Sequence, residues 1–345
     1  MKFLLIALTS LTIFVACSPA NIPTNNQFII KPQLLSFPAG SYKSVVYIDG
    51  RLVAFAEDPN PSLSDSISFA YEGDSALHPF NLEKDAACVR YTRYYVRGGT
   101  LPDGRLGLLK ECGGESLMDT NSIFAYDWKT GALEQLVKGP LPKGWLPKNY
   151  TWNPQMTRGI QEMSNRLEGT IYWISSEGTS PMDVEVADQG LEWNMKDYYA
   201  GKTRVGSVEF PAWSPDGSTI AFFASTYGIR EEPLPKMNVQ YDLYLMAPST
   251  LKPIQVLQKV ANAGQLRWSP DDKHLLFSGC MGFQLQCALW LYNLDSKSLT
   301  LVAKGDFLDF TWVTNTKVVA IKNIGETSSA DNQIWEYSLE QALKP

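Results

Sequence analysis

Two stretches of the chain repeat nearly the same pattern about 55 residues apart, AWSPDGSTIAFFAS (212–225) and RWSPDDKHLLFSG (267–279). Each contains an indole, a Ser-Pro-Asp turn and then a run of apolar, β-branched or aromatic residues. Proline fixes φ near −65° at the second place of such a turn, and aspartate and glycine suit the places that follow. A turn between two strand-like runs predicts a β-hairpin. Any fold of this chain must therefore accommodate a repeated hairpin.

Four further segments align with these two on the turn. The six turn positions lie 44 to 61 residues apart, at Asp49, Asp103, Gln155, Asp216, Asp271 and Asn315. After each turn come a second strand, a variable loop and a third strand, and most units add a fourth, as in SLTLVAK (298–304). Periods of this length with strand content are typical of propeller blades. The sequence predicts an all-β fold, a six-bladed β-propeller over residues 27–345.

The last unit lacks a fourth strand, because the sequence ends at Pro345 soon after IWEYSLE (334–340). An extra strand-like segment, QFIIKPQLLSF (27–37), precedes the first turn. Pairing this N-terminal strand with the last blade would close the ring and cover two sheet edges that would otherwise be exposed. We therefore expect the N-terminal strand to complete the last blade.

The aspartates of the turns have two interpretations, catalytic groups or parts of the turn. Asp216 and Asp271 follow Ser-Pro, where their oxygens can accept hydrogen bonds from nearby backbone N–H groups. Aromatic residues stand three positions before four of the turns, at Trp152, Trp213, Trp268 and Trp312. We expect these indoles to pack between neighbouring blades, where each buries a large area. The six residues are accordingly predicted to be structural parts of the repeat.

The segments PAWSPDGSTIAF (211–222) and LRWSPDDKHLLF (266–277) resemble the repeat of TolB-type six-bladed propellers, a WD-like class found in many exported bacterial proteins. The resemblance extends from about residue 30 onward and is best in the fourth and fifth units. It implies the same six-bladed fold.

The N-terminus has the layout of an export signal. Lys2 precedes an apolar run too short to span a bilayer, and the run ends in Phe14-Val15-Ala16-Cys17. This ending resembles a bacterial lipobox, although Phe14 stands where leucine is usual. We expect residues 1–16 to be a lipoprotein signal peptide, Cys17 the lipid anchor and residues 17–26 a flexible tether. An ordinary cleaved signal with an incidental cysteine is the alternative. Either predicts export, and the lipid anchor places the protein on the bacterial cell envelope, at its periplasmic or extracellular face.

Four cysteines follow Cys17, and an even number in an exported chain favours disulfides. Cys280 ends one apolar run and Cys287 begins the next, so a hairpin between them would set the two opposite each other. Cys88 and Cys112 are left as partners by elimination, and their spacing does not align them in an obvious register. The four cysteines have no zinc-site spacing with histidines.

The charge balance excludes nucleic acid as a partner. The formal net charge is −6, and removal of Lys2 with the signal makes it more negative. A chain of this balance offers little to neutralise phosphates.

Catalytic motifs are scarce. The sequence has no Gly-x-Ser-x-Gly elbow and no Asp-x-Asp-x-Asp-Gly calcium loop. Its only histidines are His78 and His274, and His274 shares a repeat position with Thr219 and Arg105, which favours an exposed strand residue. No cofactor is predicted, although the pattern leaves room for a cation such as calcium in the central channel.

Long loops between second and third strands, and long connections between blades, fall on one face of such a propeller, and loops on a rigid scaffold often carry binding sites. These loops hold more acidic than basic residues. Candidate partner-binding residues on them are Trp193, Tyr198, Tyr199, Arg230, Glu231 and Glu232. Our first hypothesis is a monomeric, non-catalytic binding module for a protein, peptide or envelope polymer. The alternative is an extracellular enzyme acting on a sugar or lactone, with carboxylates or a divalent ion at the channel.

Overall fold

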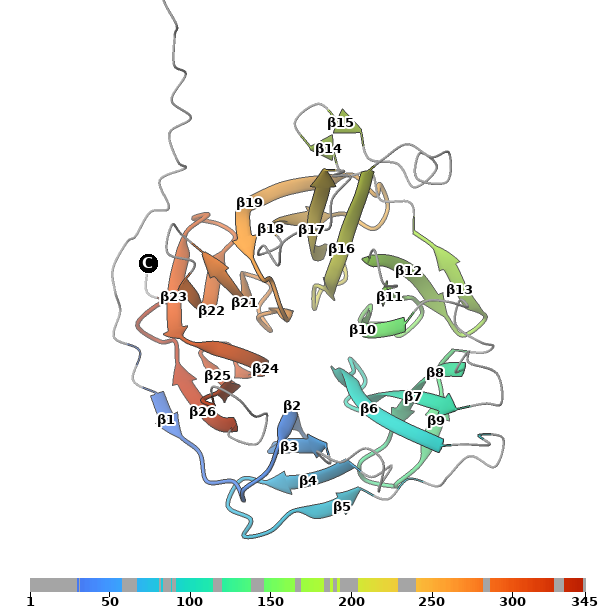
Figure 1. The fold of residues 1–345 in the computed structure, drawn as a ribbon, viewed down its shortest axis with the longest axis vertical. Helices are drawn as coiled ribbons and strands as arrows, with labels where there is room; N and C mark the ends of the chain where they lie inside the picture. The colour runs from blue at the N-terminus through green and yellow to red at the C-terminus, as the bar shows by residue number, and fades with distance from the viewer. Residues whose placement is uncertain are drawn as a thin grey trace, which may run out of the picture.

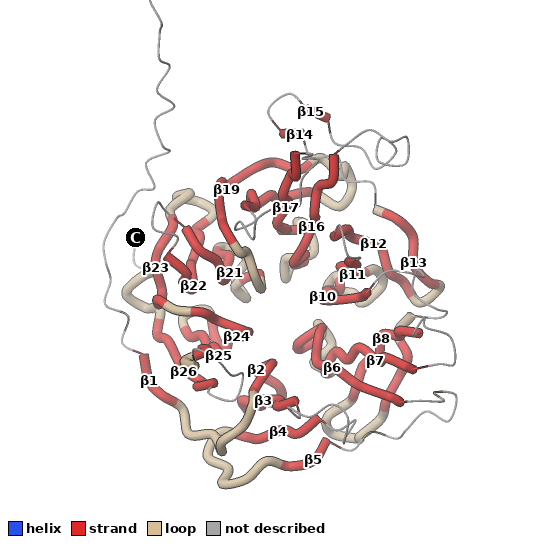
Figure 2. The backbone as a smooth tube through the Cα atoms, in the orientation of Figure 1, coloured by secondary structure: helices blue, strands red, loops and turns tan. Residues whose placement is uncertain are grey.

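The computed structural model describes residues 30, 32–57, 67–80, 82, 88, 91–113, 120–137, 146–164, 169–182, 187–188, 191–192, 204–228, 240–281, 286–325 and 332–343. Every regular element in these ranges is a β-strand (Figure 2). Over the same ranges, no helix has the length and apolar character needed to cross a bilayer. The all-β prediction is confirmed.

The sheets stand radially around a common centre, as the blades of a propeller do (Figure 1). Three of them are antiparallel sheets whose four strands pair in chain order. The first contains β2 (Tyr42–Ile48), β3 (Arg51–Glu57), β4 (Ile67–Tyr71) and β5 (His78–Phe80). The second contains β6 (Tyr91–Thr100), β7 (Leu106–Gly113), β8 (Thr120–Tyr126) and β9 (Leu133–Gln135). The third contains β10 (Leu146–Trp152), β11 (Gly159–Ser164), β12 (Gly169–Ser175) and β13 (Gly178–Pro181). A two-stranded hairpin, β14 (Ala187–Asp188) with β15 (Leu191–Glu192), follows the third sheet.

The next eight strands form a single sheet instead of two separate blades. They are β16 (Arg204–Trp213), β17 (Ile220–Gly228), β18 (Gln240–Met246), β19 (Pro253–Ala261), β20 (Leu266–Trp268), β21 (His274–Met281), β22 (Gln286–Asn293) and β23 (Leu299–Lys304). The two halves are joined by one residue pair, Ala261 of β19 opposite Cys280 of β21. The nine residues of β19 reach far enough to pair with the next repeat. The prediction of six separate four-stranded sheets is therefore met only in part.

The last sheet contains β24 (Asp306–Thr314), β25 (Lys317–Asn323) and β26 (Asn332–Ser338), and its fourth strand comes from the other end of the chain. That strand, β1 (Pro32–Leu34), lies antiparallel to β26 on the outside of the ring (Figure 1). The pairing predicted for the N-terminal segment is found. It covers the edge of β26 that would otherwise be open.

The hydrophobic core is divided into clusters that lie between neighbouring sheets or half-sheets. Trp213 packs with Ile160 and Trp173 of the third sheet, and Trp268 packs with Phe223 of the preceding repeat. Trp312 packs with Leu289 of the preceding repeat, and Trp152 packs with Leu109 of the second sheet. Each indole is at most 9% exposed. Burial of these large side chains between sheets fixes the spacing around the ring.

Candidate functional site

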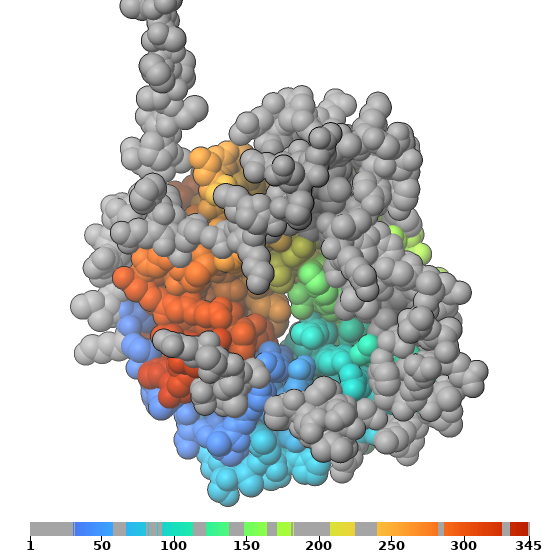
Figure 3. Space-filling model, viewed as in Figure 1, coloured from blue at the N-terminus to red at the C-terminus, as the bar shows by residue number. Residues whose placement is uncertain are grey.

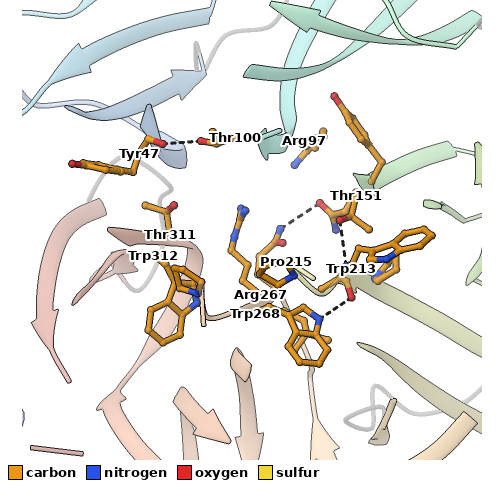
Figure 4. Close-up of a pocket in the computed structure, with 18 of the residues that line it drawn as sticks. Tyr47, Arg97, Thr100, Thr151, Trp213, Pro215, Arg267, Trp268, Thr311 and Trp312 are labelled. Carbon is orange, nitrogen blue, oxygen red and sulfur yellow. Dashed lines mark hydrogen bonds between the residues drawn. The ribbon is translucent and has the colours of Figure 1, made fainter. Parts of the chain in front are cut away.

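A cavity of about 420 Å³ lies at the centre of the ring. It is lined by the innermost strand of every repeat, β2, β6, β10, β16, β20 and β24, so no single sheet forms it alone (Figure 4). The space-filling view shows the ring hollowed at its middle (Figure 3). The cavity volume falls in the range of sites that hold small molecules.

The cavity lies at the end of the channel where each first strand turns into the second. Its lining residues occupy the last positions of the inner strands, as Tyr47 does in β2 and Thr311 and Trp312 do in β24. Pro215 and Pro270, from the two Ser-Pro-Asp turns, also line it. The long loops between second and third strands begin at the opposite ends of these hairpins. The predicted loop face falls largely on segments outside the described residues, and the cavity lies at the turn end of the described hairpins.

Arg267 crosses the cavity from β20. Its Nη2 donates to Asp309 Oδ1 of the last sheet at 2.9 Å. On the far side its Nη1 approaches Gly99 of the second sheet, where an added Cβ would lie 2.7 Å from that nitrogen. Gly99 also has φ of +62°, so any larger residue would be both strained and in contact with the guanidinium. The side chain of Arg267 is thus held in the channel by two other sheets.

Asp309 anchors Arg267 and also joins the two ends of the ring. It is 3% exposed, and its Oδ2 accepts from Ser44 Oγ at 2.7 Å and from Val45 N at 3.0 Å. Ser44 and Val45 belong to β2, so one carboxylate ties β24 to the first strand of the first sheet. Hydrogen bonds to a charged acceptor in a buried setting are among the stronger ones in proteins.

Arg97 is the second arginine that lines the cavity (Figure 4). It comes from β6, is exposed, and its Cζ lies 5.4 Å from the centre of the Tyr95 ring. Within the part of the chain that the structure describes, no carboxylate pairs with Arg97. The lining also includes no aspartate or glutamate. This end of the channel is therefore cationic.

Asn149 and Gln265 form a polar contact across the cavity, from Gln265 Nε2 to Asn149 Oδ1 at 3.4 Å. Asn149 Nδ2 in turn donates to Glu162 Oε2 behind the wall at 3.2 Å. Glu162 is fully buried, its Oε2 also accepts from Phe210 N at 2.9 Å, and its Oε1 lies 3.3 Å from Lys148 Nζ. Burial raises the pKa of the Glu162 carboxyl, although the charge of Lys148 opposes the effect. This carboxylate supports the wall and does not line the cavity.

Three of the repeat indoles, Trp213, Trp268 and Trp312, contribute to the wall, and Trp152 does not. Trp268 Nε1 donates to Ala212 O of the preceding repeat at 2.9 Å. The Nε1 atoms of Trp213 and Trp312 are buried, and neither has a hydrogen-bond partner among the described residues. The wall thus combines flat apolar surfaces with the two guanidinium groups.

Asp216 and Asp271 hold their own turns together. Asp216 accepts from Ser214 Oγ at 2.7 Å and from Ser218 N at 2.9 Å, and these bonds lower its pKa. Asp271 accepts from Ser269 Oγ at 2.6 Å. Burial acts to raise the pKa of Asp271, but the hydrogen bonds outweigh it and the pKa is lowered. Neither aspartate lines the cavity.

Both predicted disulfides, Cys280–Cys287 and Cys88–Cys112, are present. Cys280 and Cys287 are opposed in the register of β21 and β22, as the hairpin argument predicted. The other predicted site residues lie outside the described residues: Cys17, Trp193, Tyr198, Tyr199, Arg230, Glu231 and Glu232.

The prediction that His274 is an exposed strand residue is wrong. It is 6% exposed, and its Nε2 lies 3.0 Å from Asn293 Nδ2, the donor of that bond. Burial lowers the pKa of His274, although Asp271 opposes the effect. The imidazole of His274 is therefore a buried side chain that packs beside the turn.

The arginines of the cavity were not predicted, although the sequence holds a signal for one of them. In a strand, neighbours point to opposite faces. Because Leu266 and Trp268 pack between sheets, Arg267 must point to the channel. Thr151 and Thr311 hold the same place before Trp152 and Trp312, and both line the cavity. The residue before each repeat indole is therefore expected to line the channel.

The described residues include no cluster of histidine, cysteine, aspartate or glutamate that could hold a metal ion. The cavity lining offers two arginines and no carboxylate, which does not fit calcium or another hard cation, since these prefer oxygen ligands of negative charge. The cavity likewise lacks paired carboxylates for acid–base chemistry.

No protein-family model matches this sequence, and no curated protein is significantly similar to it. Among solved structures, TolB from Acinetobacter baumannii superposes with a TM-score of 0.55 at 11% identity, over 85% of this chain and 64% of that one. This chain thus spans less than two thirds of the length of that TolB. An oligogalacturonate lyase in complex with manganese gives a TM-score of 0.49 at 14% identity, over 81% of this chain and 75% of that one. A second such lyase, from Vibrio parahaemolyticus, gives a TM-score of 0.45 at 12% identity, over 90% of this chain and 93% of that one. With these TM-scores, the two lyases support no conclusion about the function of this chain. The similarity to TolB concerns the fold: this chain has the fold of a TolB-type β-propeller.

Proposed function

We propose that this protein is a non-catalytic binding module built on a rigid propeller. The observation that carries the proposal is the channel cavity, whose walls supply cationic, amide and aromatic groups for recognition. Its lining, among the described residues, contains no aspartate, glutamate, histidine or cysteine. Because these groups come from the inner strands of all the repeats, they are held in place by the whole ring. Such preorganisation favours binding.

We propose six blades as the complete count, with the eight-stranded sheet divided at β19 and β21. The single residue pair between these strands supports the division, because neighbours within a blade share several pairs. A core cluster that combines Phe223 and Leu243 of the first half with Phe277 of the second also supports it, because the other clusters likewise fill the space between neighbouring sheets. Hydrogen exchange of the full chain tests this count: the amides between β19 and β21 should exchange faster than those between β17 and β18, and equal protection would contradict the division.

We propose that the chain is exported and tethered through Cys17 after removal of residues 1–16, with residues 17–26 as the tether and residues 27–345 as the propeller. Two disulfides support an oxidising compartment. Metabolic labelling with a radioactive fatty acid tests the anchor. Label should enter the wild type and not Cys17→Ala, while label in both proteins would contradict the anchor.

The partner proposed for the loop face is a protein, peptide or polymer of the cell envelope. The test is retention of partners from an envelope extract by the full chain and by variants with the loops 226–240 and 187–207 shortened. Shortening should reduce retention at least several-fold, whereas Lys252→Ala, an exposed turn substitution away from these loops, should leave it unchanged. Unchanged retention by both shortened variants would contradict docking on this face.

The alternative function, an enzyme acting on a sugar or lactone, would require carboxylates or a divalent ion at the channel. The cavity lining contains no carboxylate, so nothing in the described channel favours this alternative. Metal analysis of the purified protein tests its metal-dependent form. A stoichiometric divalent ion would support it against the binding module.

A further inference from the structure

We propose that the channel cavity binds a singly charged carboxylate between Arg267 and Arg97. The inference rests on the binding function proposed above, but it concerns the turn end of the channel and not the loop face. The carboxylate belongs either to a small organic acid or to the end of a peptide chain. Three features of the cavity support the assignment: a preorganised fork of donors, the charge balance and the aromatic walls.

The guanidinium of Arg267 is fixed in place yet only partly used. One nitrogen, Nη2, is bonded to Asp309, and the side chain is only 25% exposed. Its Nε is buried with no hydrogen-bond partner among the described residues, and no bond from Nη1 to them is formed either. Unsatisfied buried donors are costly. Nη2 carries a second N–H, which shares an edge of the planar guanidinium with an N–H of a neighbouring nitrogen, and such an edge matches the two oxygens of a carboxylate.

The balance of charge favours one negative charge on the ligand. Arg267 and Arg97 contribute two positive charges, and Asp309 cancels one of them, which leaves one in excess. Behind the wall, Lys148 Nζ lies 3.3 Å from Glu162 and 3.9 Å from Glu209, and neither of these two carboxyl groups lines the cavity. A carboxylate would complete this balance, whereas a dianionic phosphate would leave a negative charge in a partly buried site. Uncompensated charge is expensive in such an environment.

The remaining walls suit the organic part of such an acid. Trp213, Trp268 and Trp312 present aromatic surface, and Asn149 and Gln265 add amide groups near the arginines. A cavity of about 420 Å³ holds a small acid or the last residues of a chain, and it does not admit a folded domain.

The experiment is an NMR titration of the full chain labelled with ¹⁵N at arginine, with benzoate as the monoanionic probe and benzamide as its neutral match, at constant ionic strength. Benzoate should shift an arginine Nε–H signal in a saturable way, and benzamide should not.

Arg97→Gln should weaken benzoate binding about tenfold, because one charged hydrogen-bond donor is lost. Arg267→Lys keeps the charge next to Asp309 but loses the fork, and it should also weaken binding. Arg105→Gln is the matched control, because Arg105 is paired with Asp103 and Glu134 outside the cavity and its loss should leave benzoate binding unchanged.

Further arms distinguish the source of the carboxylate. If N-acetyl-Gly-Phe as the free acid binds more tightly than benzoate, and its amide does not bind, the natural ligand is a chain end. If benzoate binds at least as tightly as the peptide acid, the natural ligand is a small organic acid. No saturable benzoate shift, equal shifts from benzamide, or tighter binding of inorganic phosphate than of benzoate would overturn the proposal. Partner retention by the loop face is measured separately, so failure of either proposal is recognised without the other.

Discussion

Glu162 shows how one residue can couple the wall of the channel to pH. Its carboxylate has no solvent exposure and lies where β10, β11 and β16 meet, bonded to Asn149 Nδ2 and Phe210 N. Lys148, which is 42% exposed on its side chain, supplies only partial compensation at 3.3 Å. Burial therefore dominates and raises the pKa of Glu162 above the ordinary value of 4.5.

Glu162→Gln should change how stability depends on pH. In the folded protein the carboxyl holds its proton at pH values where the unfolded chain has lost it. The folded state thus binds more protons, and the wild type gains stability relative to the glutamine variant as pH falls through the raised folded pKa toward 4.5. Urea unfolding of both proteins at pH 8 and at pH 5 measures this. Glu72→Gln, at an exposed turn position, is the control. A difference between wild type and Glu162→Gln that stays constant with pH, or that grows in favour of the wild type as pH rises, would contradict the assignment.

At the scale of elements, one disulfide joins two paired strands and the other joins a strand to a residue before its neighbour. Cys280 lies opposite Cys287 on the hairpin of β21 and β22, so this bridge closes a separation of only seven residues. Cys112 of β7 is joined to Cys88, a residue that precedes β6 by three positions, across a separation of 24. A cross-link stabilises mainly by restricting the unfolded chain, and longer loops lose more freedom.

Removal of the two bridges should therefore have unequal costs. Loop-closure entropy gives about 2.4 kcal/mol for the Cys280→Ser, Cys287→Ser double variant and about 3.5 kcal/mol for Cys88→Ser, Cys112→Ser. Urea unfolding of the two variants and the wild type, with the remaining disulfide intact, gives both values. The reverse order would show that the folded state, and not the unfolded chain, determines what each bridge contributes.

At the scale of the whole molecule, the repeat explains which features could be predicted. Each Ser-Pro-Asp turn is a local device, so the hairpins around Asp216 and Asp271 follow from a few adjacent residues. Ring closure also followed, because a missing fourth strand at one end matched an extra strand at the other. The joining of two repeats at Ala261 and Cys280 depends on how far β19 extends, and no local signal encodes that length. The cationic cavity requires side chains from six strands to converge, so only the alternation around Arg267 pointed toward it.

The seam of the ring provides a matched pair of substitutions. Leu35 directly follows β1, is 6% exposed and packs with Val45 of β2 and Ile334 of β26. Its N–H donates to Ile334 O at 2.9 Å. The preceding residue, Leu34, is 50% exposed although it belongs to the same segment. The two leucines therefore differ in burial much more than in position.

Leu35→Ala should destabilise the protein by about 2–5 kcal/mol, because it opens a cavity between the two sheets that the N-terminal strand joins. Leu34→Ala should change the free energy of unfolding by no more than about 0.5 kcal/mol. Hydrogen exchange should then show where the loss falls. In Leu35→Ala the amides of β2, β25 and β26 should exchange faster, while those of β17 and β18, on the other side of the ring, should change less, because local opening at a seam precedes global unfolding. Equal costs for the two substitutions, or equal acceleration all around the ring, would mean that the N-terminal strand does not hold the propeller closed.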